Sequence, residues 1–198
     1  MNVFLDGEYV FSLADTETAH LQVGQRLEDA TIRELERTDA RARAYSQALL
    51  FLALRPRSQR EVKDNLAAKG YSNDEICAVL KRLKDGGLVD DLAFAQYWVD
   101  QRQTFRPRSI AALRHELRQK GVEPETIASS VGAVDEEALA YQAATKWVRH
   151  GSLLTGNDLQ KLSSFLLRRG FSYRLVRETV SRVAGELGRD LSSTNDSD

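Results

Sequence analysis

Three glycines spaced almost evenly along the chain constrain its fold more than any other feature. Gly70, Gly121 and Gly170 stand 51 and 49 residues apart in a chain of 198 residues. Aligned on these glycines, six further positions keep an apolar residue in all three copies, which indicates an internal repeat. In order along the repeat, the eighteen residues are Val62, Leu113 and Leu162; Leu66, Leu117 and Leu166; Tyr71, Val122 and Phe171; Ile76, Ile127 and Val176; Leu80, Val131 and Val180; Leu83, Val134 and Val183.

Each glycine is expected to end a helix and start a turn. Lys69, Lys120 or Arg169 precedes it, and a basic residue is stabilising at a helix C-terminus. Glycine adopts the left-handed conformation that other residues resist. The apolar residue after it can then fold back onto the leucine five positions earlier, as in a Schellman motif. A second helix follows at once, because Ser72-x-x-Glu75 fits a capping box and Pro124 suits an early helical position.

A third helix is expected upstream of each pair. Its face contains Ala48, Val99 and Val148, each 22 positions before its glycine, and a tryptophan precedes the last two. A unit of three helices fits the period. Tandem stacking of such units predicts an all-α protein with an elongated, curved body.

The ends of the chain differ from the repeats. Residues 3–5 and 8–13 flank Asp6-Gly7, which favours a small β-hairpin with a type I′ turn that caps the helical body. Apolar spacing from Leu27 to Leu52 predicts one helix or two consecutive helices. We therefore divide the chain into a hairpin and helical lead-in (1–39), repeat 1 (40–91), repeat 2 (92–136), repeat 3 (137–187) and a disordered polar tail (188–198).

The sequence gives no indication of an enzyme. It has no glycine-rich phosphate loop, no pair of His or Cys residues at zinc spacing, and only one cysteine, which excludes an intrachain disulfide. No cofactor or metal is expected. The chain lacks a signal peptide, and its longest apolar stretch, residues 48–54, is too short to span a bilayer. A protein of the cytoplasm without membrane contact is expected.

The formal net charge of -1 hides an uneven distribution. Residues 1–54 have 5 basic and 9 acidic side chains, residues 55–187 have 22 and 17, and residues 188–198 have 1 and 3. The repeats are therefore basic between two acidic ends. Such local patches are compatible with an acidic partner although the total charge is near zero.

One basic motif occurs twice. Arg55-Pro56-Arg57-Ser58 recurs as Arg106-Pro107-Arg108-Ser109, whereas the third copy reads Thr155-Gly156-Asn157-Asp158 at that place. Each serine can cap the following helix, which leaves the arginines free to reach a partner. Two interpretations stay open here: a solvated basic loop, or a contact with phosphate or an acidic protein.

Six segments and one arginine together match the pattern of a known protein family. They are Leu52–Glu61, Leu66–Tyr71, Leu80–Leu83, Gly87–Trp98, Glu116–Val122 and Arg168–Phe171, together with Arg102. On these residues the chain resembles the RecX family, the regulatory proteins of the RecA recombinase, over residues 40–187. The third-copy loop departs from the motif, so the three repeats are not expected to contact a partner identically.

The resemblance implies a non-enzymatic modulator that binds RecA and its filaments on single-stranded DNA. It implies inhibition of filament growth, ATP hydrolysis, strand exchange and co-protease activity, with effects on DNA repair and the SOS response. A monomer with weak direct binding to single-stranded DNA is expected. The candidate contact residues are Arg55, Arg57, Arg60, Lys63, Arg102, Arg106, Arg108, Arg114, Arg118, Lys120, Lys161, Arg168, Arg169, Arg174 and Arg177.

Two other classes of function stay open. Residues 58–91 also read as a helix-turn-helix or winged-helix module that would place Lys81, Arg82 and Lys84 in a DNA groove. A helical scaffold for an unrelated protein partner is the third hypothesis.

Overall fold

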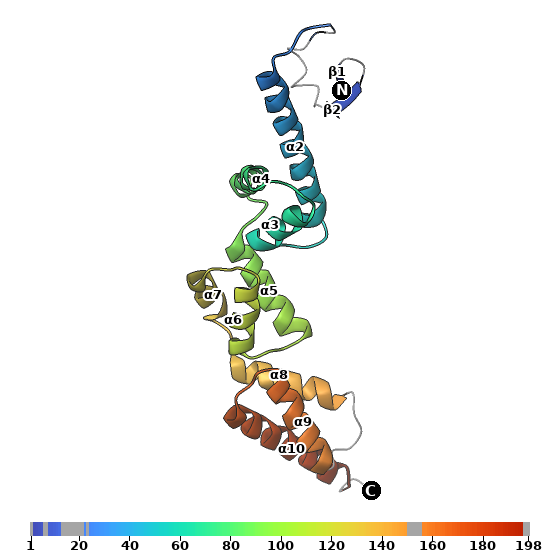
Figure 1. The fold of residues 1–198 in the computed structure, drawn as a ribbon. Coiled ribbons are helices and arrows are strands. Elements are labelled where there is room, and N and C mark those ends of the chain that lie inside the picture. Colours follow the sequence, from blue (N-terminus) through green and yellow to red (C-terminus); the bar gives the residue numbers. More distant parts are fainter. Residues whose placement is uncertain (1, 6–7, 13–21, 23, 150–155, 196–198) are drawn as a thin grey trace. The chain divides into compact units, whose positions relative to one another are not determined.

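The protein, analysed as a computed structural model, is helical apart from two short strands in the part of the chain that the structure describes. That part comprises residues 2–5, 8–12, 22, 24–149 and 156–195. In chain order the elements are β1 (Asn2–Leu5), β2 (Glu8–Ser12), α2 (Asp29–Leu52), α3 (Gln59–Ala68), α4 (Asn73–Asp85), α5 (Asp91–Phe105), α6 (Ile110–Gln119), α7 (Pro124–Val131), α8 (Glu136–Arg149), α9 (Gly156–Arg168) and α10 (Tyr173–Asn195) (Figure 1).

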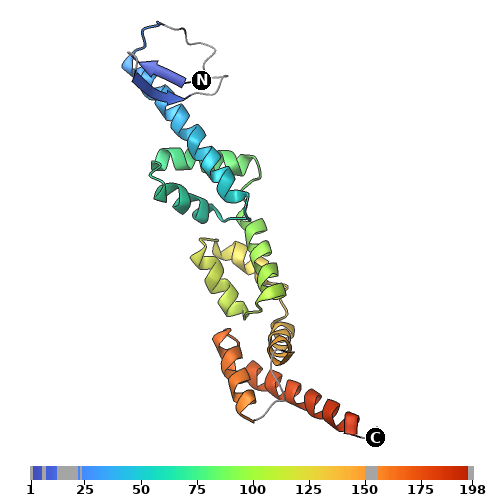
Figure 2. The same ribbon diagram turned by 90° about the vertical axis from the view of Figure 1, so that its right-hand side faces the viewer.

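The helices form three groups of three, as the repeat predicts. Figure 2 shows the helices of each group together. Helices α2–α4, α5–α7 and α8–α10 each enclose a hydrophobic core of their own. The chain divides into two compact units, residues 1–90 and 91–198, so the first unit contains repeat 1 and the second contains repeats 2 and 3. The predicted elongated, curved body stays a prediction.

The apolar positions of the repeat form these cores. Val62, Leu113 and Leu162 have no exposed surface, nor do the leucines four residues before each glycine. Ala48 and Val99, which represent the first helix of their repeats, are also buried. The two tryptophans that precede Val99 and Val148 are half-buried. The three-helix unit is therefore confirmed at the level of individual side chains.

The glycine turns have the predicted geometry in all three copies. Gly70, Gly121 and Gly170 have φ angles of 86°, 78° and 90°. The residue after each glycine donates its N–H to the carbonyl of the leucine five positions earlier, at 3.1–3.3 Å. The glycine itself donates to the residue three positions back, so both bonds of a Schellman motif are present.

Serine caps start α3 and α4, and proline starts α7. Ser58 and Ser72 each form a complete capping box with the glutamate three residues later, and Pro124 occupies the first turn of α7. Ser109 accepts a hydrogen bond from the Ala112 N–H at 3.1 Å but lacks a carboxylate partner at that position. Its own backbone N–H is therefore available for another acceptor.

That acceptor comes from repeat 3. The Ser109 N–H donates to the Arg169 carbonyl at 3.2 Å, and the neighbouring Ile110 N–H donates to Glu136 Oε1 at 2.8 Å. Gly170 lies so close that a Cβ there would be 2.6 Å from Ser109 Oγ and 3.1 Å from the Ala112 Cβ. The C-terminus of α9 thus closes against the N-terminus of α6, which joins repeats 2 and 3.

The predictions for the two ends of the chain agree less well with the structure. Strands β1 and β2 pair antiparallel, with Val3 opposite Phe11, but the predicted Asp6-Gly7 turn lies outside the described residues. The predicted boundary between residues 39 and 40 lies within α2, which is one continuous helix. Helix α10 continues to Asn195, whereas the sequence places its end at Leu187 and a disordered tail beyond it. An isolated glycine such as Gly188 weakens a helix by about 1 kcal/mol without ending it.

We predict that Gly170→Ala destabilises the protein more than Gly70→Ala does. Both changes place a side chain at positive φ, which costs about 1–2 kcal/mol. A Cβ at Gly70 meets no other atom within 4 Å, so only the close approach of Gly170 to Ser109 adds a further cost, of about 1–3 kcal/mol. Urea unfolding measures both losses.

A double-mutant cycle with Ser109→Ala tests the cause of the difference. The combined loss in Gly170→Ala/Ser109→Ala should be smaller than the sum of the single losses, because the Oγ that meets the new Cβ is gone. Equal losses for the Gly70 and Gly170 variants would contradict the close joint.

Candidate partner-binding site

One carboxylate in repeat 2 contacts a tryptophan and two arginines. Glu116 on α6 accepts hydrogen bonds from the Trp98 indole at 2.8 Å and from Arg102 Nε at 2.7 Å. Arg108 Nε lies 2.9 Å from the other oxygen of the same carboxylate. The Glu116 side chain is only 15% exposed, so one negative charge holds two guanidinium groups in a half-buried setting.

The ring of Trp98 contacts two cations. The Arg102 guanidinium and the Lys120 ammonium lie 4.5 and 5.1 Å from the centre of the Trp98 ring. Cation–π contact of this kind fixes a cation without neutralising it. The cluster of Arg102, Arg108 and Lys120 around Glu116 therefore retains an excess of positive charge.

Repeat 3 adds another guanidinium to this excess. Arg169 Nη1 donates to the Pro107 carbonyl at 3.2 Å, and its guanidinium lies 4.7 Å from the centre of the Phe165 ring. Burial lowers the pKa of Arg169 below its usual value, and the like charges of Arg108, Arg106 and Arg102 lower it further. Arg169 of repeat 3 is thus repelled by three arginines of repeat 2, and an anionic partner would relieve that repulsion.

The arginines of the duplicated loop are less free than the sequence suggests. In repeat 1, Arg55 makes a two-point ion pair with Glu61 at 2.9 and 3.2 Å, and Arg57 lies 3.9 Å from the centre of the Phe51 ring. Arg108 is paired with Glu116, so Arg106 is the one of the four that is classed as exposed. The expectation of free arginines is wrong for the other three, because half-buried glutamates and a ring lie within their reach.

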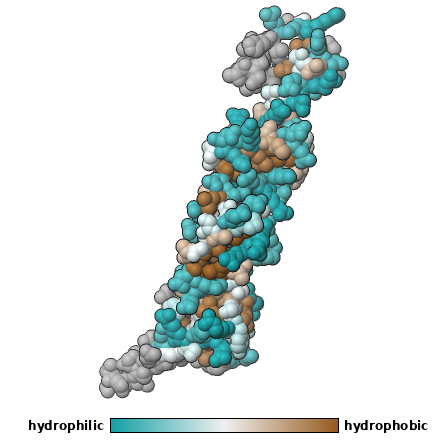
Figure 3. Space-filling view, turned by 90° about the vertical axis from the view of Figure 1, so that its left-hand side faces the viewer, coloured by the Kyte–Doolittle hydropathy of each residue, from teal (hydrophilic) through white to brown (hydrophobic). Residues whose placement is uncertain are grey.

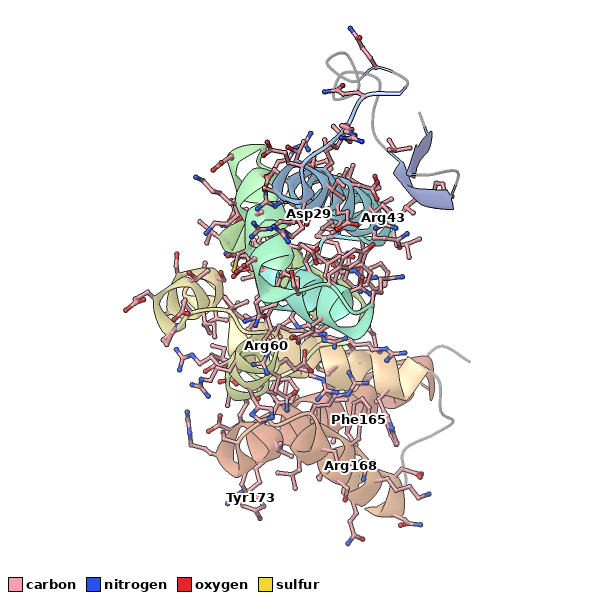
Figure 4. The ribbon with its side chains drawn as sticks, turned by 45° about the horizontal axis from the view of Figure 1, so that its top comes forward. Asp29, Arg43, Arg60, Phe165, Arg168 and Tyr173 are labelled. Atoms are coloured by element: carbon pink, nitrogen blue, oxygen red, sulfur yellow. The ribbon has the colours of Figure 1, made fainter. Side chains whose placement is uncertain are left out.

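The remaining predicted residues are distributed over the surfaces of the repeats. Three of them pair with an acidic residue on their own helix: Arg60 with Asp64, Lys161 with Asp158 and Arg174 with Glu178. Those that are exposed are Arg60, Lys63, Arg106, Arg114, Arg118, Lys161, Arg168, Arg174 and Arg177. Figure 4 labels Arg60 on repeat 1 and Arg168 on repeat 3. No partner contact of these residues is tested, and their role stays a prediction.

The outer face of α6 is the most uniformly basic of these surfaces. Its exposed charged positions are Arg114 and Arg118, with His115 between them, while the acidic residue of the helix, Glu116, points into the cluster described above. Sequence reasoning missed Glu116 as an organising residue. In the sequence it is marked only as the one acidic residue of the segment 110–119.

The alternative DNA-reading helix is α4. Lys81, Arg82 and Lys84 are exposed there, and the Arg82 guanidinium lies 4.0 Å from the centre of the Tyr45 ring. Asp74 and Asp85 are exposed on the same helix. This face is therefore of mixed charge, in contrast to α6.

Comparison with known proteins decides the family. Family models described as the first, second and third three-helix domains of RecX match residues 44–83, 90–130 and 134–180. A regulatory protein RecX from Bacillus subtilis is 31% identical over 195 residues, covering 96% of this chain and 74% of that protein. The chain belongs to the RecX family. Another relative of that name, from a Mycobacterium species, is 36% identical and covers 74% of this chain and 85% of its own.

Solved structures of the RecX family share the fold. The crystal structure of a regulatory protein RecX superposes with a TM-score of 0.68 at 26% identity, covering 90% of this chain and 91% of that one. The crystal structure of RecX from Lactobacillus salivarius has a TM-score of 0.60 at 22% identity, covering 74% and 97%. The relatives are named regulatory proteins, which supports a regulatory role for this member of the family.

The described residues contain no group of three or more His, Cys, Asp and Glu side chains placed to hold a metal ion. Within the same residues, no helix is both long enough and apolar enough to cross a membrane.

We predict that Glu116→Gln destabilises the protein by about 2 kcal/mol, because it removes the charge-assisted hydrogen bond from Arg102 and the ion pair with Arg108, and leaves the repulsion between these arginines uncompensated. Urea unfolding measures the loss. Added salt should recover part of it by screening that repulsion.

Glu123→Gln is the matched control, because Glu123 is exposed and its side chain makes no cap hydrogen bond. Its effect should stay within about 0.5 kcal/mol. A loss in Glu116→Gln no larger than this would show that Glu116 does not organise the cluster.

Proposed function

We propose that this protein binds RecA and RecA filaments on single-stranded DNA and regulates them, mainly by inhibition. Filament growth, ATP hydrolysis, strand exchange and co-protease activity would fall, with effects on DNA repair and the SOS response. The observation that carries the proposal is membership of the RecX family across all three repeats. Regulation of this kind needs no chemistry of its own, only a surface that occupies the filament.

The charges of repeats 2 and 3 support an anionic partner. Arg169 is repelled by three arginines of repeat 2 where these repeats join, and the exposed face of α6 adds Arg114 and Arg118. A filament that contains DNA has phosphate groups, which such cations bind without reading the base sequence. Charge complementarity also raises the rate and the selectivity of association.

Polar residues cover most of the surface in the view of Figure 3, with apolar patches between them. A surface of this composition is typical of proteins that form reversible interfaces, whereas permanent interfaces are more apolar. We expect a monomer that binds its partner reversibly, with direct binding to single-stranded DNA as a weaker activity.

A titration tests the proposal. Increasing amounts of the protein are added to RecA hydrolysing ATP on single-stranded DNA, and binding to the filament and to bare DNA is measured at one salt concentration. We expect ATP hydrolysis to fall and the filament to be bound more tightly than DNA alone.

The competing duplex-reading function predicts a different pattern. A sequence-specific helix-turn-helix protein binds its site about 10³-fold or more tighter than other duplex DNA. Such a ratio, together with no effect on RecA, would contradict the proposal. No effect on RecA and no DNA binding would leave the scaffold hypothesis.

We predict that Arg114→Glu/Arg118→Glu raises the protein concentration needed for half-inhibition of the RecA ATPase by about tenfold, equivalent to about 1.4 kcal/mol of lost binding. Both side chains are exposed, so the fold should persist in circular dichroism.

The control is Arg33→Glu/Arg37→Glu. These residues are exposed on α2, and their reversal changes the net charge equally. It should change half-inhibition by less than about twofold, since charges distant from a contact are screened. Equal effects of the two double variants would show that only total charge matters.

A further inference from the structure

A groove of about 430 Å³ lies where repeats 2 and 3 join. Its walls combine the end of α5 and the loop that follows it with residues of α8 and the C-terminal end of α9. The lining residues are Phe105, Pro107, Ala143, Lys146, Trp147, Phe165 and Arg169. Five of the seven are apolar and two are cations, and no carboxylate lines it among the described residues. Figure 4 shows Phe165 between α8 and α9.

Two hydrogen bonds between repeats 2 and 3 hold the cations that line this groove. Arg169 donates to the Pro107 carbonyl, and the Lys146 ammonium donates to the carbonyl of Thr104. Each bond uses one of five N–H groups of the guanidinium or one of three of the ammonium. Both cations are thereby fixed at the groove by the 104–107 segment, with donor capacity that these bonds do not use.

The aromatic residues form an irregular floor rather than a stacking platform. The rings of Trp147 and Phe165 lie 6.4 Å apart and are tilted by 40°, and the Arg169 guanidinium covers Phe165 at 4.7 Å. Bases of single-stranded nucleic acid stack on flat, open ring faces. A tilted and partly covered pair of rings suits a single inserted side chain better. Phe105, which is 67% exposed, extends this floor to the rim.

The positive charges around the groove favour acidic residues on either side of the inserted side chain. Exposed Arg106 lies next to Pro107, and the electrostatic effect of Arg102, Arg106 and Arg108 reaches Arg169. Glu116, the carboxylate that Arg102 and Arg108 contact, is also bound by Trp98. Carboxylates brought by a partner would relieve the remaining repulsion.

We infer that this groove binds an acidic peptide segment of a partner protein, with one aromatic or large aliphatic side chain inserted between Phe105, Trp147 and Phe165. Carboxylates of the segment pair with Lys146, Arg106 and Arg169. The volume lies within the range of small-ligand sites and admits one large side chain with its neighbouring backbone. The inference goes beyond the proposed function, because it does not depend on the identity of the partner.

The test uses the full chain and a synthetic peptide with one phenylalanine flanked by glutamates. The chain has two tryptophans, so Trp98→Phe leaves Trp147 as the sole reporter, at the floor of the groove. Titration calorimetry of the unsubstituted chain gives the same affinities if Trp98→Phe folds poorly. The peptide should change Trp147 emission saturably, and peptides with glutamine for glutamate, or serine for phenylalanine, should bind about tenfold more weakly.

Matched variants place the peptide in the groove. Phe105→Ala should weaken binding about tenfold, and Tyr173→Ala should leave it unchanged, because Tyr173 is equally exposed at 68% but lies on α10 outside the groove. Arg106→Glu should likewise weaken binding more than Arg114→Glu, which changes the net charge equally.

Three outcomes would overturn the inference: no saturable binding of the acidic peptide, equal effects of Phe105→Ala and Tyr173→Ala, or binding of an oligothymidine with the same dependence on Phe105 while the peptide fails. The last would assign the groove to nucleic acid. Because RecA is absent from these experiments, their failure is separate from any failure of the proposed function.

Discussion

The left-handed glycine at the end of the second helix of each repeat is the constraint on which the structure depends. It lets the chain reverse in one residue, so the next apolar side chain returns to the core and a third helix begins immediately. In repeat 3 the glycine turn also packs against repeat 2. Gly170 has no Cβ, and its turn therefore fits against Ser109, which places Arg169 among the arginines of repeat 2. A local backbone requirement thus determines where charges from two repeats meet.

The sequence predicts the contents of each repeat well, because the relevant interactions are local. The Schellman bonds after Leu66, Leu117 and Leu166 depend on residues at most five positions apart. It predicts the joint poorly, since the bond from Ser109 to Arg169 spans 60 residues. A small signal existed: Ser58 has Glu61 to complete its capping box, whereas Ser109 has Ala112 and so leaves a backbone donor available.

The difference between local and long-range interactions also explains which site residues the sequence predicts. Basic residues are visible in the sequence, so it predicts every guanidinium of the candidate site. Their counter-charges were not, because Glu116 gathers Trp98, Arg102 and Arg108 only when α5 and α6 pack together. The net charge of -1 therefore reveals neither the paired arginines nor the local excess of positive charge. Paired arginines stabilise repeats, whereas the excess on α6 and at the joint is available for a partner.

Hydrogen–deuterium exchange of this chain, with and without RecA filaments on single-stranded DNA, tests most directly the claim that repeats 2 and 3 present the binding surface. The account predicts slower exchange on α6 and on the segments around Phe105 and Arg169, which border the joint. Helix α4, whose exposed face is of mixed charge, should exchange as before. Protection confined to α4, or none anywhere while the filament is bound, would contradict the account.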